Sequence, residues 1–189
     1  MNNEESFTVN YLGGNVLTND PSMTAWGWAV IGFNGNIIDF GCIKTESQHK
    51  KQRIRKGDDT VRRCSEISRE LIDIIRKYNV TYMLSELPHG SQNASAAQMI
   101  GMVVGVAQTI SDCFNIGIEW YSEADSKKAV LKKISSTKTE MVTAICHLYK
   151  DFNKTGVKYK DEAIADALAI HHAAILNSST LKFLKTISK

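Results

Sequence analysis

Three short apolar runs open the chain, and their order constrains the fold more than any other feature of the sequence. The runs are NVLTN (15–19), AWGWAVIGF (25–33) and NIIDFGCI (36–43). The second and third are joined by NGN (34–36), which is typical of the tight turn in a β-hairpin. Because such turns connect neighbouring antiparallel strands, the first part of the chain is predicted to form an antiparallel meander.

The rest of the chain alternates between helical and strand patterns. Apolar residues at helical spacing predict a helix over 60–78, VTYMLSE (80–86) predicts a buried strand, and 94–114 predicts a helix rich in small residues. A fifth strand over 116–122 precedes helices expected over 123–134, 135–152 and 161–176. A meander followed by alternating strands and helices predicts an α/β fold with a five-stranded mixed sheet flanked by helices.

Length and composition limit the organisation of the chain. A length of 189 residues suits one domain, expected over 15–177 between a flexible N-terminal tail (1–14) and a C-terminal tail (178–189). The net charge of +3 neither requires nor excludes a nucleic-acid partner. Four widely spaced cysteines favour reduced thiols over a zinc site. No secretory signal or membrane span is expected, because apolar stretches are short.

Three acids end or interrupt these apolar elements. Asp20 ends the first run, Glu86 ends VTYMLSE, and Asp166 lies within AIADALAIHHA (163–173). An acid in an apolar element is costly to bury unless it is paired or binds a metal. Divalent magnesium prefers carboxylate oxygens, and a pair of such ions can promote hydrolysis of a phosphodiester. The three acids therefore predict a metal site.

Each acid also has an ordinary explanation when taken alone. Asp20 could form an Asx-turn before Pro21, Glu86 could meet solvent at a loop, and Asp166 could pair with a nearby lysine. These explanations weaken when the acids are considered jointly, because all three would have to fall at such positions by accident.

Four segments in their order along the chain resemble the RuvC-type Holliday-junction resolvases of the ribonuclease-H-like superfamily. They are NDPSMTAWGWAVI, YMLSELPHGSQNASAAQMIGMVVGVAQTI, EWYSEADSKKAVLKKISSTKTEMV and DEAIADALAIHHA. The resemblance runs from about Val16 to about Ala174. It implies a ribonuclease-H-like five-stranded mixed sheet, with Asp20, Glu86 and Asp166 as ligands of one or two Mg²⁺ or Mn²⁺ ions per subunit.

The fourth acid that the resemblance implies falls on Ala163, three residues before Asp166. Glu162 is the favoured replacement, because it precedes Asp166 by about one helical turn. Asp161 is the substitute. The family's basic residues near the scissile phosphate fall on Lys127 and Lys138, where a cation could offset developing charge.

Further DNA contacts are expected from the loops. The resemblance places His89 where some members carry an aromatic wedge, although an exposed loop histidine is an equal alternative. A basic stretch could neutralise phosphates on a DNA arm, although such clusters are also found simply solvated. Its residues are Lys50, Lys51, Arg53, Arg55 and Lys56.

The function expected from the resemblance is that of a metal-dependent, structure-selective endonuclease that resolves four-way and other branched DNA junctions by paired symmetric nicks. A homodimer would supply the two-fold symmetry, with the 94–114 helix as a candidate dimer face, although packing of this helix on its own sheet is an equal alternative. The expected location is the cytoplasm of a bacterial cell or a phage-infected host. Whether a branch-migration motor is a partner stays open.

Other functions are compatible with parts of the sequence. A related nuclease could act on a fork, a flap or an RNA–DNA hybrid, and Ala163 also fits a branched-DNA-binding protein with weak catalysis. A sugar-kinase or actin-like ATPase is disfavoured, since those chains are about twice as long.

Overall fold

The opening runs form the antiparallel meander that their turn residues predict. In the computed structural model, which describes residues 14–187, these strands are β1 (Asn15–Asp20), β2 (Ala25–Gly32) and β3 (Ile37–Lys44). Gly35 adopts a φ of 91° in the β2–β3 turn, a conformation that favours glycine. Strands β4 (Val80–Glu86) and β5 (Gly117–Tyr121) complete a mixed sheet in the order β3-β2-β1-β4-β5.

The register of the sheet brings the ends of three strands to one edge. β4 runs parallel to β1, with Asn19 paired to Ser85. β5 runs parallel to β4, with Tyr121 paired to Glu86. Parallel strands end at the same edge of a sheet. The segments that follow β1, β4 and β5 in the chain therefore start close together.

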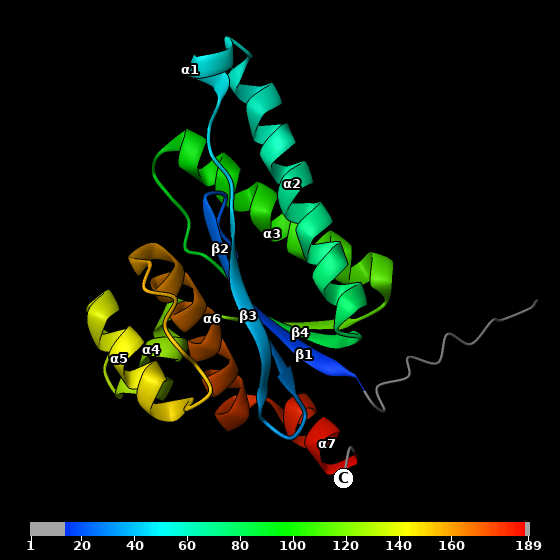
Figure 1. The fold of residues 1–189 in the computed structure, drawn as a ribbon, viewed down its shortest axis with the longest axis vertical. Helices are drawn as coiled ribbons and strands as arrows, with labels where there is room; N and C mark the ends of the chain where they lie inside the picture. The colour runs from blue at the N-terminus through cyan, green and yellow to red at the C-terminus, as the bar shows by residue number, and fades with distance from the viewer. Residues whose placement is uncertain (1–13, 188–189) are drawn as a thin grey trace, which may run out of the picture.

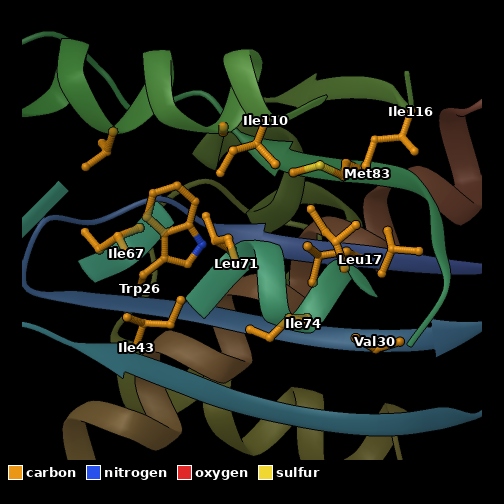
Figure 2. Packing of buried hydrophobic residues seen from close by; sticks show 14 of the residues in the cluster. Leu17, Trp26, Val30, Ile43, Ile67, Leu71, Ile74, Met83, Ile110 and Ile116 are labelled. Carbon is orange, nitrogen blue, oxygen red and sulfur yellow. The ribbon is translucent and has the colours of Figure 1, made fainter. Parts of the chain in front are cut away.

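Two long helices, α2 (Lys56–Lys77) and α3 (Ala94–Phe114), cover one face of the sheet. Figure 2 shows the core between them and the strands, where Trp26 and Leu17 of the sheet meet Leu71 and Ile110 of the helices. These four side chains are almost completely removed from water. Burial of this apolar area stabilises the sheet that carries the acids.

Helices α4 (Glu123–Leu131), α5 (Lys138–Leu148) and α6 (Lys158–Asn177) cover the opposite face (Figure 1). α6 lies against β1 and β2 and presents alanines to them, so its backbone comes very close. A Cβ added to Gly27 would lie 1.9 Å from the carbonyl oxygen of Ala163. The hydroxyl of Thr18 donates to the carbonyl oxygen of Ala167 at 2.6 Å. These contacts set the position of α6 over the sheet.

The C-terminal end of the chain differs from the sequence prediction. Residues 178–189 were expected as a tail, but helix α7 (Ser179–Ile187) occupies most of them. Its Leu181 and Leu184 are buried in the core between sheet and helices, and this burial holds the segment in place. The N-terminal tail predicted over 1–14 lies outside the described residues except for Gly14.

The polar connection before α2 also contains structure. A short helix, α1 (His49–Gln52), lies there, and α2 begins at Lys56 rather than at Thr60. Asp59 anchors the connection, because its buried carboxylate accepts hydrogen bonds from Ser47, the backbone of Gln48 and Arg62. These bonds tie the start of the basic stretch to helix α2.

Helix α3 is unusually apolar for its exposure. By length and composition it could cross a membrane, with a mean hydropathy of 1.2, although only 22% of that window is buried in the fold. One side of α3 packs on α2 and β5. The other side exposes Ala97, Gly101 and Gly105.

Candidate active site

Asp20 and Glu86 lie side by side at the end of the central strands. The residues that precede them, Asn19 and Ser85, are buried and bonded to each other, with the Ser85 hydroxyl donating to Asn19 Oδ1 at 3.1 Å. The Asn19 amide also donates to the carbonyl oxygen of Leu84 at 3.1 Å. This cross-strand clamp holds the two carboxylates at a defined separation on the sheet edge.

Asp166 reaches the same place from helix α6. The helix is fixed to β1 by the Thr18–Ala167 hydrogen bond, one residue from Asp166. It is fixed to β2 where Gly27 touches Ala163, and Gly27 is the residue paired with Asp20. Asp166 is thereby placed over the end of β1.

The three predicted acids line one cavity of about 200 Å³. Its remaining walls come from the start of α4, the loop before α5 and the first turn of α5. The lining residues are Asp20, Glu86, Glu123, Lys127, Ser136, Thr137, Lys138, Met141 and Asp166. The three acids that the sequence singled out thus line the same cavity, and their role as metal ligands stays a prediction.

The acids in this cavity resist ionisation. Burial, followed by the charges of Glu86 and Asp166, raises the pKa of Asp20 well above its ordinary value. Burial and the charge of Asp166 raise the pKa of Glu86 to about 7. Burial also raises the pKa of Asp166, although Lys138 opposes the shift. Each group would ionise more readily if a cation were bound between them.

Two lysines supply positive charge at the cavity. Lys138 forms an ion pair with Asp166. Burial alone would lower the pKa of Lys138, but Asp166, Asp20 and Glu86 raise it, so the lysine stays charged. Lys127 lies 2.6 Å from a carboxylate oxygen of Glu123. Both lysines that the sequence singled out therefore border the acids.

The donor set fits a hard divalent cation. Among residues 14–187, the carboxylates of Asp20 and Glu86 accept no side-chain hydrogen bond and face a polar cavity. Within the same residues, no three acidic, cysteine or histidine side chains already converge on one ion position. The carboxylate of Asp166 is instead paired with Lys138. A cation would supply the charge that these side chains lack.

The structure corrects the predicted fourth acid. Glu162 borders a different cavity, between α5 and the start of α6, and lies 3.9 Å from Lys158. Asp161 borders that second cavity too, and its carboxylate accepts hydrogen bonds from the backbone and hydroxyl of Thr155 at 2.7 Å. Four residues of helix span about 6 Å along the axis. Glu162 therefore borders the next cavity, although its charge still raises the pKa of Asp166, behind the effect of burial.

A fourth acid is nevertheless present, and sequence analysis missed it. Glu123 is the first residue of α4 and lines the cavity with the three predicted acids. The available signal was its position two residues after the fifth strand, at the edge where Asp20 and Glu86 also lie. That signal depends on knowing that β5 pairs with β4, which the sequence alone does not reveal.

The remaining predicted residues are exposed around this edge. His89 lies in the loop after β4. The hydrogen bond and charge of Lys127 lower the pKa of Glu123, with smaller contributions from Lys138 and His89. The basic residues of the α1 segment are exposed, and Lys56 donates to Ser95 at the start of α3 at 2.6 Å. Figure 1 shows α1 and the start of α3 at the same end of the molecule.

Comparison with known proteins identifies the family. The model of the family described as crossover junction endodeoxyribonuclease RuvC matches residues 16–174. The chain belongs to the RuvC family. This match confirms the resemblance expected from the sequence and the enzyme class, that of a crossover junction endodeoxyribonuclease.

Individual RuvC proteins are distant in sequence but similar along their length. The RuvC of Orientia tsutsugamushi is 28% identical over 168 residues, covering 86% of this chain and 95% of the relative. The RuvC of Halothermothrix orenii is 29% identical over 161 residues, covering 82% of this chain and 88% of the relative. A structure of Thermus thermophilus RuvC in complex with a Holliday junction substrate superposes with a TM-score of 0.66 at 15% identity. The superposition covers 88% of this chain and 96% of the Thermus chain. The predicted ribonuclease-H-like sheet is thus confirmed.

Proposed function

We propose that this RuvC-family protein is a divalent-metal-dependent endonuclease that resolves four-way DNA junctions by paired symmetric nicks. The observation that carries the proposal is the convergence of Asp20, Glu86 and Asp166 on one cavity. It is supported by the family match over residues 16–174. The Thermus thermophilus relative is known in complex with a Holliday junction as its substrate.

Asp20, Glu86 and Asp166 would hold one or two Mg²⁺ or Mn²⁺ ions per protomer. When bound, such ions supply a positive charge that favours attack of water on a phosphodiester and neutralises the leaving oxygen. The contribution of the chain is to hold the carboxylates in place. The Asn19–Ser85 clamp fixes two of them and the Thr18–Ala167 contact fixes the third.

Lys138 would pair first with Asp166 and then with a phosphate of the DNA. Without a cation it neutralises Asp166. Its side chain is more than half exposed, so it could turn toward a phosphate once Asp166 engages a metal. Lysine then acts as a point charge beside developing negative charge. Lys127 stands at the same cavity wall and would bind the DNA backbone there.

The exposed basic residues around this edge would grip the arms of branched DNA. Lys50 and Lys51 lie in α1, Arg53 and Arg55 follow it, and Lys56 begins α2. Neutralising several phosphates makes binding strongly salt-dependent. His89, in the loop beside the cavity, would contact bases or backbone near the junction centre.

A homodimer would supply the second active site. Two nicks on opposite strands of a junction require two sites related by two-fold symmetry. The exposed side of α3 is the proposed dimer face, since Ala97, Gly101 and Gly105 allow close helix approach and a groove beside them is lined by Cys64, Met102 and Val106. A cytoplasmic location, where the DNA substrate lies, accompanies this proposal.

A panel of DNA substrates tests the proposal. Purified protein with Mg²⁺ is incubated with a synthetic four-way junction, a fork, a flap, an RNA–DNA hybrid and a linear duplex of matched arm sequence. We expect the four-way junction to be cleaved fastest, with symmetric nicks, and no cleavage in EDTA. Faster cleavage of a fork, flap or hybrid would assign the same site to another substrate. Junction binding without any cleavage would indicate a protein that has lost catalysis.

A further inference from the structure

The metal site as proposed has three acids, and helix α6 offers no fourth one. The turn of α6 that lies nearest to Asp20 carries Ala163, which is 6% exposed. Its backbone presses on Gly27, the strand partner of Asp20. Glu162 and Asp161 border the second cavity instead. Any fourth carboxylate must therefore come from another element.

Strand β5 delivers such a carboxylate to the cavity. The strand ends at Tyr121, beside Glu86, and its last carbonyl oxygen accepts a hydrogen bond from the backbone of Leu87 at 2.8 Å. Ser122 then caps α4, and Glu123 is the first helical residue. This path carries Glu123 from the sheet edge directly to the cavity wall that faces Glu86 and Asp20.

The side chain of Glu123 has no structural duty in the helix cap. The capping box is formed by Ser122 and Asp125, whose side chain accepts from the Ser122 backbone at 3.0 Å. Glu123 instead meets Lys127 at 2.6 Å, and both side chains border the cavity. Of the two acids in the first turn of α4, one caps the helix and the other turns toward the acids.

We propose that Glu123 is the fourth carboxylate of the metal site and takes the place of an acid at position 163. The inference rests on the proposed metal-dependent function and adds a ligand to it. Lys127 then acts for Glu123 as Lys138 acts for Asp166, as a counter-ion that neutralises the carboxylate before a cation binds.

The charge distribution agrees with this assignment. Burial is the main cause of the raised pKa of Asp20, Glu86 and Asp166. The negative charge of Glu123 raises the pKa of all three further. Glu123 is thus close enough to be felt by all three acids. A cation placed among those three would be felt by Glu123 in the same way.

An acid in the first turn of a helix, paired with a lysine four residues later, is also a common way to stabilise a helix end. That role would leave metal affinity unchanged when Glu123 is replaced by its neutral isostere. The two explanations therefore separate on metal binding itself, without any need to measure cleavage.

The test is a titration of the full-length protein with Mn²⁺, followed by the loss of the free-ion signal in electron paramagnetic resonance. Glu123→Gln is compared with the unaltered protein and with Glu162→Gln, a control that removes the same charge from the neighbouring cavity. We expect Glu123→Gln to weaken Mn²⁺ binding at least about tenfold, since losing even an outer-shell partner costs about that much. Glu162→Gln should weaken binding far less, because Glu162 borders the neighbouring cavity and acts on Asp166 only through its charge.

Melting curves in EDTA show that each variant is folded. A further variant, Asp20→Asn, distinguishes failure of the Glu123 assignment from failure of the metal site itself. If Asp20→Asn weakens Mn²⁺ binding but Glu123→Gln does not, the assignment of Glu123 is wrong and the metal site stands. If Asp20→Asn has no effect either, the metal site itself is wrong. A loss in Glu162→Gln as large as in Glu123→Gln would also overturn the assignment.

Discussion

At the scale of single residues, the cavity concentrates negative charge that the fold must tolerate. Asp20 and Glu86 are half-buried and repel one another, and their raised pKa values reflect the cost of removing their charges from water. Lys138 and Lys127 offset part of it through their ion pairs. Side chains arranged in this way destabilise the protein without its cation and are suited to bind one.

The cost can be measured at Glu86. The folded protein holds the Glu86 proton more tightly than the unfolded chain, because the pKa rises from the ordinary 4.5 to about 7. This contribution to stability is complete below pH 4.5 and is lost as the pH rises through 7. In EDTA at pH 8, Glu86→Gln should therefore raise the melting temperature, by about 2–4 °C for each kcal/mol recovered.

Scanning calorimetry at pH 8 and at pH 4.5 gives both parts of this result. The gain at pH 8 should be mostly lost at pH 4.5, where Glu86 is protonated in the folded protein and half protonated in the unfolded chain. Equal melting temperatures of the variant and the unaltered protein at pH 8 would show that Glu86 is not held in a repulsive site.

At the scale of elements, the strand ends were readable from the sequence because apolar runs stop there. Asp20 and Glu86 were placed correctly on that basis. Glu123 was not, since its position depends on β5 pairing with β4, a contact between distant segments. Glu162 borders a different cavity, because helical periodicity gives the direction of a side chain around the axis but not its neighbours one turn further along.

Helix α6 can approach the sheet this closely because Gly27 has no side chain. In Gly27→Ala the new methyl group would meet the backbone of Ala163, so the helix would have to move away from the strand that carries Asp20. We expect a loss of about 1–3 kcal/mol in the free energy of unfolding, as for other overpacked contacts. Junction cleavage should fall as well, because Asp166 moves with the helix.

Gly57→Ala is the matched control for this prediction. A Cβ at Gly57 in α2 would meet no atom within 4 Å, and alanine is the better helix former. Urea unfolding should show this variant to be at least as stable as the unaltered protein. If Gly27→Ala is equally stable, α6 is not held where the structure places it.

At the scale of the whole molecule, the sequence predicted the fold class because five strands and their turns could be read in order. The C-terminal helix α7 escaped notice, since its burial depends on the groove that α6 and the sheet create for Leu181 and Leu184. The apolar exposure of α3 is a property of the assembled surface. The sequence shows that α3 is apolar, but not which side of the helix packs on the core and which side stays exposed.

The proposed dimer face predicts how junction resolution responds to a charge on α3. Gly101 is exposed, with no atom near its Cβ position, so Gly101→Lys should fold normally. It should shift the protein toward the monomer in analytical ultracentrifugation and uncouple the two nicks. Leu148→Lys, at an exposed leucine of α5, is the control and should stay dimeric. An unaltered dimer in Gly101→Lys would place the interface elsewhere.

The central claim is that Asp20, Glu86 and Asp166 form the metal-dependent centre that cuts branched DNA. The most direct test compares Asp20→Asn with the unaltered protein on a synthetic four-way junction, measuring cleavage in Mg²⁺ and binding in Ca²⁺. Asparagine keeps the size of the side chain and removes its charge, so cleavage should fall at least about a thousandfold, on the scale of a lost charge-stabilising group. Binding should stay within a few-fold. Cleavage at the normal rate by Asp20→Asn would contradict the account.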